Sequence, residues 1–159
     1  MISYFEDVEI GESLELGQHT FTREEVERFA EKFDPQPFHL SEDGAAKTFF
    51  KHQCASGWHT AAVFMKLFVA KLEELQRKAT EEGLRPARLG PSPGFKDLKW
   101  IKPVYVGDTL LYSRIVTGKT ESRSRPEWGL LHSDTLAHNQ DGTLVFSFKA
   151  TVFLERKPR

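Results

Sequence analysis

The chain has 159 residues, of which 39% are hydrophobic, and 22 Lys plus Arg nearly balance 23 Asp plus Glu. This size and composition predict one domain over residues 1–159 and exclude a disordered or collagen-like chain. With no long run of like charge, the sequence carries no electrostatic footprint for nucleic acid or an anionic membrane, so a small molecule or a protein is the expected partner.

The N-terminal segment predicts a cytoplasmic protein. Residues 1–10 are acidic where a signal peptide would be basic, and no long apolar segment follows them. The longest stretch free of charged residues, 53–65, is shorter than the roughly 20 residues that a membrane-spanning helix needs. Weak alternation of apolar and polar residues over 4–20, with a turn signal at Gly11, predicts short strands.

The next segments predict helices. Thr22 and Glu25 have the spacing of a capping box, and apolar residues recur at helical period over 23–33, where we expect a helix. Pro35 and Pro37 must end it, because the residue before a proline avoids helical geometry. A short helix is expected over 41–50, and a longer helix from Gly57 is apolar on nearly every side in its first two turns, which is typical of a buried helix.

The second half of the chain predicts a loop and then strands. Residues 81–93 are rich in Gly and Pro and indicate a long loop. Segments rich in β-branched and aromatic residues follow, separated by turn signals, and we expect strands over 99–106, 109–118, 130–139 and 143–154. Helices followed by an antiparallel meander place the chain in the α+β class.

Three motifs in this order carry a family resemblance. They are Phe-Ala-Glu-Lys-Phe-Asp-Pro-Gln-Pro-Phe-His-Leu at 29–40, Ala-Ser-Gly-Trp-His-Thr at 55–60, and Lys-Pro-Val-Tyr-Val-Gly-Asp-Thr at 102–109. With them the chain resembles the MaoC-like dehydratases, a hot-dog family that contains the (R)-specific enoyl-CoA hydratases. The resemblance implies a single hot-dog domain, in which an antiparallel sheet wraps around a long central helix.

The resemblance also implies a reaction. In the family, an Asp and a His in an Asp-x-x-x-x-His pattern act together on the water that adds across the double bond of a 2-enoyl thioester. Here these residues are Asp34 and His39, and Gln36 stands where the family usually has Asn, one methylene shorter. The glycine that opens the buried helix, here Gly57, would donate its backbone N–H to the thioester carbonyl. The implied substrate is an acyl-CoA or acyl-carrier thioester, without a metal or a redox cofactor, and the implied assembly is a homodimer or a dimer of dimers.

The residues by themselves leave alternatives open. Asp34 and His39 meet only if the chain turns between Pro35 and Phe38, because residues five apart on a straight strand point to opposite faces. Otherwise Asp34 simply caps the preceding helix and His39 lies at the surface. Ser56 is interpreted as a helix cap beside the substrate rather than as a nucleophile, since no base stands at a recognisable spacing.

Other polar residues have structural explanations. His52, Cys54 and His59 lack a common zinc spacing, and a single cysteine forms neither an internal disulfide nor a cysteine-rich metal site, so we expect no metal. Trp58 and His59 are expected near the mouth of the site. Basic residues in two loops either meet CoA phosphates or, as we favour, are solvated: Arg85, Arg88, Lys96, Lys119, Arg123 and Arg125. Phenylalanines either line an acyl tunnel or, for the most part, form the core: Phe49, Phe50, Phe64 and Phe68.

Two competing functions remain at this stage. A hot-dog thioesterase would direct water to the thioester carbonyl, and the Asp-x-x-x-x-His arrangement argues against it. A non-catalytic thioester-binding subunit would keep the shape without efficient chemistry, and Gln36 is its one indication. Turnover of a 2-enoyl thioester separates these two functions from a hydratase.

Overall fold

The computed structural model describes residues 3–158, and within them one five-stranded antiparallel sheet runs in the order β1-β3-β4-β5-β2. The strands are β1 (Ser13–Thr20), β2 (Gly94–Trp100), β3 (Thr109–Glu121), β4 (Trp128–His138) and β5 (Leu144–Glu155). The helices are α1 (Arg23–Phe33), α2 (Pro37–Leu40), α3 (Glu42–Ala46) and α4 (Gly57–Glu81).

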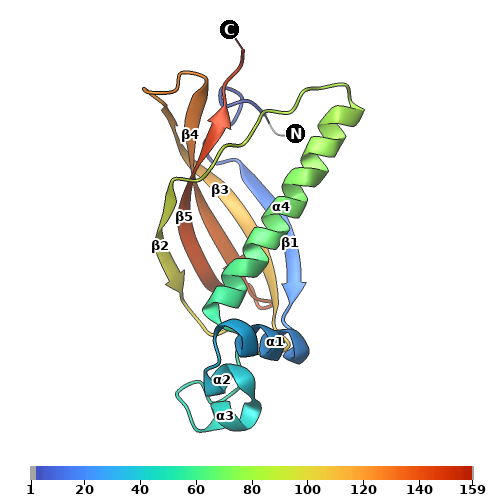
Figure 1. Cartoon of the computed structure of the whole chain (residues 1–159), viewed down its shortest axis with the longest axis vertical. Helices are drawn as coiled ribbons and strands as arrows, with labels where there is room; N and C mark the ends of the chain where they lie inside the picture. Colours follow the sequence, from blue (N-terminus) through green and yellow to red (C-terminus); the bar gives the residue numbers. More distant parts are fainter. Residues whose placement is uncertain (1–2, 159) are drawn as a thin grey trace.

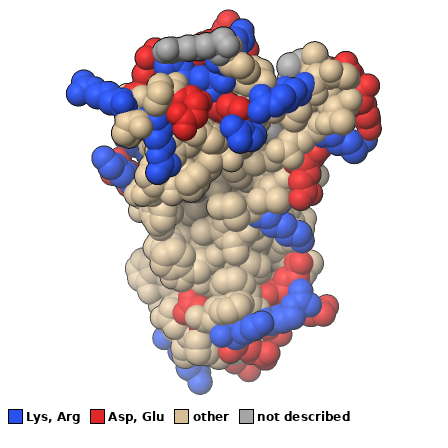
Figure 2. Space-filling model, turned by 45° about the horizontal axis from the view of Figure 1, so that its top comes forward, with Lys and Arg blue, Asp and Glu red and all other residues tan. Residues whose placement is uncertain are grey.

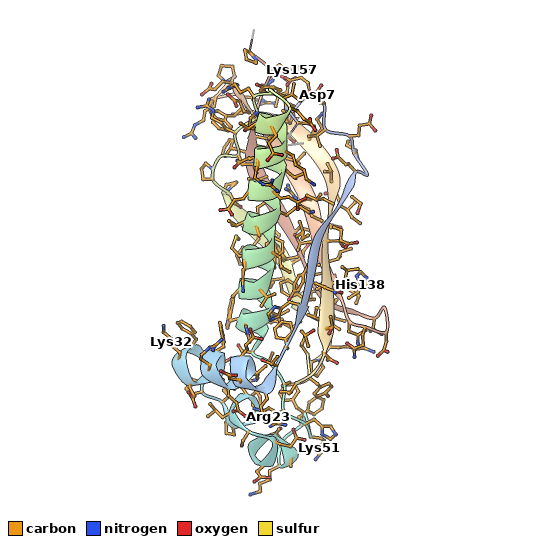
Figure 3. All side chains as sticks on the ribbon, turned by 90° about the vertical axis from the view of Figure 1, so that its right-hand side faces the viewer. Asp7, Arg23, Lys32, Lys51, His138 and Lys157 are labelled. Carbon is orange, nitrogen blue, oxygen red and sulfur yellow. The ribbon has the colours of Figure 1, made fainter. Side chains whose placement is uncertain are left out.

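The long helix α4 lies across one face of the sheet, which curves around it (Figure 1). Figure 3 shows the same two layers from the side, with the short helices near Arg23 and Lys51 at one end and the pair of Asp7 and Lys157 at the other. A sheet wrapped around one long helix is the hot-dog fold, and the predicted α+β class is confirmed.

The core lies between α4 and the curved face of the sheet. Along β3 and β4 buried residues alternate with more accessible ones, because successive side chains of a strand point to opposite faces. Val63 and Phe64 of α4 pack against fully buried Leu110, Tyr112 and Phe146. The Tyr112 hydroxyl donates to the Thr60 carbonyl at 3.0 Å, so a polar group in this core is satisfied by the helix.

The first helix forms where its sequence predicts. Thr22 is its N-cap and accepts a hydrogen bond from the Glu25 amide at 3.3 Å, while the Thr22 hydroxyl donates to the Glu25 carboxylate. The helix ends at Phe33, before Pro35, and α2 starts with Pro37 in its first turn, where the missing N–H costs no hydrogen bond.

Two predicted boundaries are wrong. The strand expected over 99–106 is β2, which begins at Gly94 and ends at Trp100. The chain then bends at Lys102, before Pro103, which lacks an N–H for a ladder, and forms only an isolated bridge at Tyr105. The helix expected over 41–50 is only α3, which ends at Ala46, and the chain then turns through Lys51 at a φ of 66°.

The first two turns of α4 are not buried on every side, contrary to the sequence prediction. Trp58 is 55% exposed and Met65 is 52% exposed, and Val69 on the same side of the helix is also exposed. The sheet covers this side of α4 only in part, and Trp58 packs edge to face on Trp100 with 5.1 Å between the ring centres. Within residues 3–158, no helix is long and apolar enough to cross a membrane.

Candidate active site

Asp34 and His39 lie side by side at the end of the molecule where α4 begins. Asp34 caps the C-terminus of α1, and the single turn of α2 carries His39 back toward it, with the His39 amide donating to the Gln36 carbonyl at 2.9 Å. The Asp34 Oδ2 to His39 Nε2 distance is 3.3 Å. The chain therefore turns between Pro35 and Phe38, as a functional Asp-x-x-x-x-His pair requires.

The His39 ring is held by a backbone carbonyl. Its Nδ1 lies 2.7 Å from the Cys54 carbonyl oxygen, which can only accept, so Nδ1 carries a proton. In the neutral imidazole, Nε2 is then the acceptor and faces Asp34. The Cys54 thiol lies 3.8 Å from Nδ1, and burial, with the charge of Asp34, raises its pKa to about 11, so it stays protonated.

Two side chains hold the Asp34 carboxylate. The Ser56 hydroxyl donates to Oδ2 at 2.6 Å, and the Gln36 amide donates to Oδ1 at 2.8 Å. Burial acts to raise the pKa of Asp34. These two hydrogen bonds outweigh it, with the charge of His39 adding to them when that ring is protonated, and hold the pKa below its usual value. Asp34 is therefore ionised at neutral pH.

Ser56 also has the capping role that the sequence predicts. It is the N-cap of α4, and its Oγ accepts a hydrogen bond from the Trp58 amide at 3.2 Å. Because the side chain is 1% exposed and its proton is given to Asp34, Ser56 joins the helix start to the carboxylate. No histidine among residues 3–158 accepts this proton, which fits a positioning residue rather than a nucleophile.

Gly57 opens α4 directly beside this pair. A Cβ at this position would overlap the Trp100 indole, so the close approach of β2 to the helix requires glycine here. The first amides of a helix have no intrahelical acceptor, and within residues 3–158 the Gly57 N–H has no other acceptor. A free N–H at the N-terminus of a 25-residue helix favours a negatively charged oxygen.

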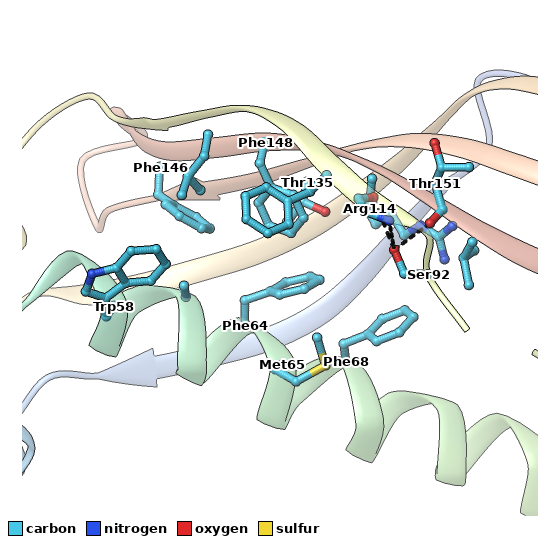
Figure 4. Close-up of a pocket in the computed structure, with 16 residues that line it drawn as sticks. Trp58, Phe64, Met65, Phe68, Ser92, Arg114, Thr135, Phe146, Phe148 and Thr151 are labelled. Atoms are coloured by element: carbon cyan, nitrogen blue, oxygen red, sulfur yellow. Dashed lines mark hydrogen bonds between the residues drawn. The ribbon is translucent and has the colours of Figure 1, made fainter. Parts of the chain in front are cut away.

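These groups line a cavity of about 470 Å³. Its walls include the residues of the pair and the helix start, with aromatic and aliphatic side chains around them: Phe38, Phe49, Phe50, Trp100, Ile101 and Phe146. A second cavity of about 460 Å³ lies between α4 and the strands β2 and β5, and Trp58 and Phe146 line both (Figure 4). The cavity that contains Asp34 and His39 therefore adjoins a second cavity that is mostly apolar.

Two histidines named from the sequence lie elsewhere. Trp58 lines the candidate site as predicted, but His59 does not, because each helical residue turns about 100° and His59 stacks on Phe29 on the other side of α4. Burial and the charge of His19 lower the pKa of His59 to about 4, so its ring is neutral at pH 7. His52 is bound to Glu42 at 2.8 Å. Within the described residues, no group of three or more metal-ligating side chains forms.

Three of the six loop cations named from the sequence bind other groups of the protein. Lys119 donates to the carbonyls of Glu6 and Val8, and Arg85 and Arg88 both pair with the Glu155 carboxylate. Arg85 and Arg88 are nevertheless 55% and 63% exposed, in agreement with the favoured interpretation of solvated charge. Of the phenylalanines, Phe64 is in the core and Phe68 packs against it, but Phe49 is 92% exposed because it follows the end of α3 in an open turn.

Sequence reasoning missed two elements of the site. The Cys54 carbonyl that orients His39 is a backbone group, and Trp100 meets Gly57 only through the pairing of β2 with β5. Neither contact leaves a signal in residue type or spacing.

Comparisons of the sequence and of the structure with known proteins agree with one another. The family model described as MaoC-like domain matches residues 6–129. The chain is 29% identical over 147 residues to the uncharacterized protein YdeM of Bacillus subtilis, covering 92% of this chain and 95% of YdeM. It is 29% identical over 123 residues to the (R)-specific enoyl-CoA hydratase of Rhodospirillum rubrum, covering 74% and 72% of the two chains. A solved MaoC-like dehydratase from Rhodospirillum rubrum matches with a TM-score of 0.82 and 31% identity, covering 99% of each chain.

Proposed function

Because the chain belongs to the MaoC-like domain family, we propose that it is a hydratase/dehydratase that adds water across the double bond of a 2-enoyl thioester. The observation that carries the proposal is the Asp34–His39 pair, with 3.3 Å between Oδ2 and Nε2 beside the free N-terminus of α4. Residues 1–159 act in this proposal as one hot-dog domain. The reaction is redox-neutral, so the proposal includes no cofactor other than the thioester substrate.

The proposed roles of the pair follow from its protonation. Asp34 is ionised and His39 presents an unprotonated Nε2, so a water between them donates one hydrogen to each acceptor. This leaves an oxygen lone pair directed at the β-carbon of the substrate. As the C–O bond forms, the pair takes one proton from the water and delivers it to the α-carbon, acting first as general base and then as general acid.

Gly57 has the complementary role. When water adds to the β-carbon, electrons of the double bond move toward the thioester carbonyl and its oxygen becomes an enolate. A backbone N–H aimed at that oxygen stabilises the charge as it develops, with help from the positive end of α4. Gln36 and Ser56 would hold the carboxylate in place through the hydrogen bonds described above.

The two adjoining cavities suggest how the substrate lies. The reacting atoms of the acyl chain would occupy the cavity with the Asp34–His39 pair, and the rest of the chain would pass Trp58 and Phe146 into the apolar cavity beneath α4. The thioester would carry either CoA or an acyl-carrier group toward solvent.

We also propose that two copies of the chain associate. Apolar side chains on α4, on β2 and after β2 are exposed together: Trp58, Met65, Val69, Phe95, Trp100 and Ile101. Figure 2 shows a broad uncharged area, hollowed at its centre, between charged groups at the ends of the molecule. Because β2 is also an edge strand with an unpaired backbone, a second copy that covers this face would form a homodimer, or a dimer of dimers.

Incubation with crotonyl-CoA tests the function. A hydratase removes the ultraviolet absorbance of the conjugated enoyl thioester without releasing thiol. Release of free CoA thiol would indicate a thioesterase, and no reaction with a panel of enoyl thioesters that nevertheless bind would indicate a binding subunit.

A further inference from the structure

Arg114 is a buried cation without an ion-pair partner among residues 3–158. It lies on the inner face of β3 and is 9% exposed. Its Nε donates to the Ser133 hydroxyl at 2.8 Å, and its guanidinium carbon lies 5.5 Å from the centre of the Phe68 ring. Its Nη2 is buried and has no hydrogen-bond partner within residues 3–158, and no carboxylate there lies within ion-pair distance of the guanidinium.

Burying the Arg114 charge without a bound ligand costs free energy. A guanidinium has five N–H donors and stays protonated in proteins, and a buried charge normally has a paired anion. Burial lowers the pKa of Arg114. The Glu12 carboxylate, which lines a second, smaller cavity together with Arg114, only partly opposes that effect and forms no ion pair with it. Stacking on Phe68 satisfies none of the free N–H groups.

The guanidinium lies at the far end of the apolar cavity. Figure 4 shows Trp58 at one end of this cavity and Arg114 at the other, beside Ser92 and Thr151. Thr135 lines the same cavity, pairs with Arg114 across β3 and β4, and has a fully buried hydroxyl without a partner within residues 3–158. Most of the wall between the two ends is hydrophobic or aromatic, including Phe64, Phe68, Phe146 and Phe148.

The strand register gives the depth of this polar end. Phe146 lines both cavities, and along β5 the partners of Thr135 and Ser133 are Phe148 and Ala150, two and four residues farther on. At about 3.3 Å per residue, the Arg114 end lies about 7 to 13 Å beyond Phe146, which lines both cavities. A medium-length acyl chain spans such a distance.

We propose that the Arg114 end of the cavity binds a carboxylate at the far end of the acyl chain, so that the preferred substrates are monothioesters of 2-enedioic acids. This inference rests on the proposed function. A carboxylate accepts two parallel hydrogen bonds from the guanidinium and one from the Thr135 hydroxyl, and it neutralises the buried charge. A terminal methyl group would leave all of these groups unpaired, and water would satisfy single N–H groups without neutralising the charge.

The test compares matched CoA thioesters that end in a carboxylate or a methyl group, such as trans-2-octenedioyl-CoA and trans-2-octenoyl-CoA. Matched pairs of six and ten carbons test how far the carboxylate site lies from the reacting atoms. Hydration is measured as kcat/KM, and binding of the saturated octanedioyl and octanoyl thioesters is measured by calorimetry. At the best length, we expect the wild type to favour the carboxylate form at least 30-fold in both measurements.

The variant Arg114→Met should lower that preference by about the same factor, because it removes the charge at similar volume. Arg28→Met makes the same chemical change at an exposed arginine and should leave the preference unchanged. Thr135→Val provides a second, nearly isosteric variant that should reduce the preference several-fold.

The outcomes separate the two proposals. Hydration of both forms without a preference at any length would overturn this inference and leave the proposed function intact. A binding preference lost in Arg114→Met, without hydration of any ester, would support the inference and refute the proposed function. An unchanged preference in both the Arg114 and Thr135 variants would also overturn it.

Discussion

Replacing Ser56 with alanine should destabilise the folded protein and shift the acid side of the pH profile of its activity. The Ser56 hydroxyl caps α4 through the Trp58 amide and donates to the Asp34 carboxylate at 2.6 Å. Loss of an N-cap costs about 1 kcal/mol, and loss of a hydrogen bond to a charged group costs about 1.5–3 kcal/mol. We therefore expect Ser56→Ala to lower the free energy of unfolding by about 3 kcal/mol at neutral pH, as measured by urea denaturation.

The sign of the pH effect follows from the lowered pKa of Asp34. In the wild type this carboxyl contributes stability above its unfolded pKa, and that contribution is lost as the pH falls through the lower folded pKa. Without the Ser56 hydrogen bond, the folded pKa rises. The decline in kcat/KM for crotonyl-CoA on the acid side should therefore begin at a higher pH in the variant.

A matched control is Thr22→Ala, which removes the N-cap of α1 without touching Asp34. It should cost about 1 kcal/mol of stability and leave the acid side of the activity profile in place. A folded Ser56→Ala protein with the same acid profile as Thr22→Ala would refute the assigned link between Ser56 and Asp34.

Three further predictions address Gln36, Gly57 and assembly. The Gln36 amide donates to the Asp34 carboxylate at 2.8 Å, and the side chain of Gln36→Asn is one methylene shorter, so turnover of crotonyl-CoA should fall several-fold. The family pattern alone favours an increase instead, and a higher rate would show that this hydrogen bond is dispensable. Gly57→Ala should place a methyl group against the Trp100 indole and cost about 1–3 kcal/mol of stability, with kcat/KM at least tenfold lower; Trp100→Leu added to it should restore part of both losses, and no restoration would contradict the steric reason. Light scattering should give at least twice 18.2 kDa for the wild type, and Val69→Glu, which places a charge on the exposed side of α4, should shift the mass toward one chain; an active wild-type monomer would contradict the proposed dimer.

Local sequence signals predicted the parts of the fold that depend on local physics. Thr22, Glu25 and Pro35 define α1, since capping and proline geometry act within a few residues. The β-branched and aromatic residues over 109–118 and 130–139 predicted β3 and β4. The end of β2 was missed because the β-branched and aromatic residues over 99–106 favour a strand, although Pro103 among them cannot donate to a ladder.

In the candidate site, too, some features were predictable from the sequence and others depend on tertiary contacts. The Asp34 and His39 positions came from a family motif, and their spacing alone left open whether they meet. The Cys54 carbonyl and the position of His59 on the other side of α4 depend on tertiary packing. The sequence gives no sign of a special role for Arg114, because an arginine within a strand is common, and its burial and missing hydrogen-bond partner are seen only in the structure.

The most direct test of the account is a double-mutant cycle on Asp34 and His39 with crotonyl-CoA. Asp34→Asn and His39→Ala should each reduce kcat about 100-fold or more, since positioned acid–base groups contribute about 10² to 10⁴. Because both groups act on one water, the double variant should be little slower than the slower single variant. Circular dichroism and light scattering check that each variant keeps its fold and mass. Folded single variants that hydrate crotonyl-CoA at nearly the wild-type rate would contradict the assignment of this pair as the catalytic centre.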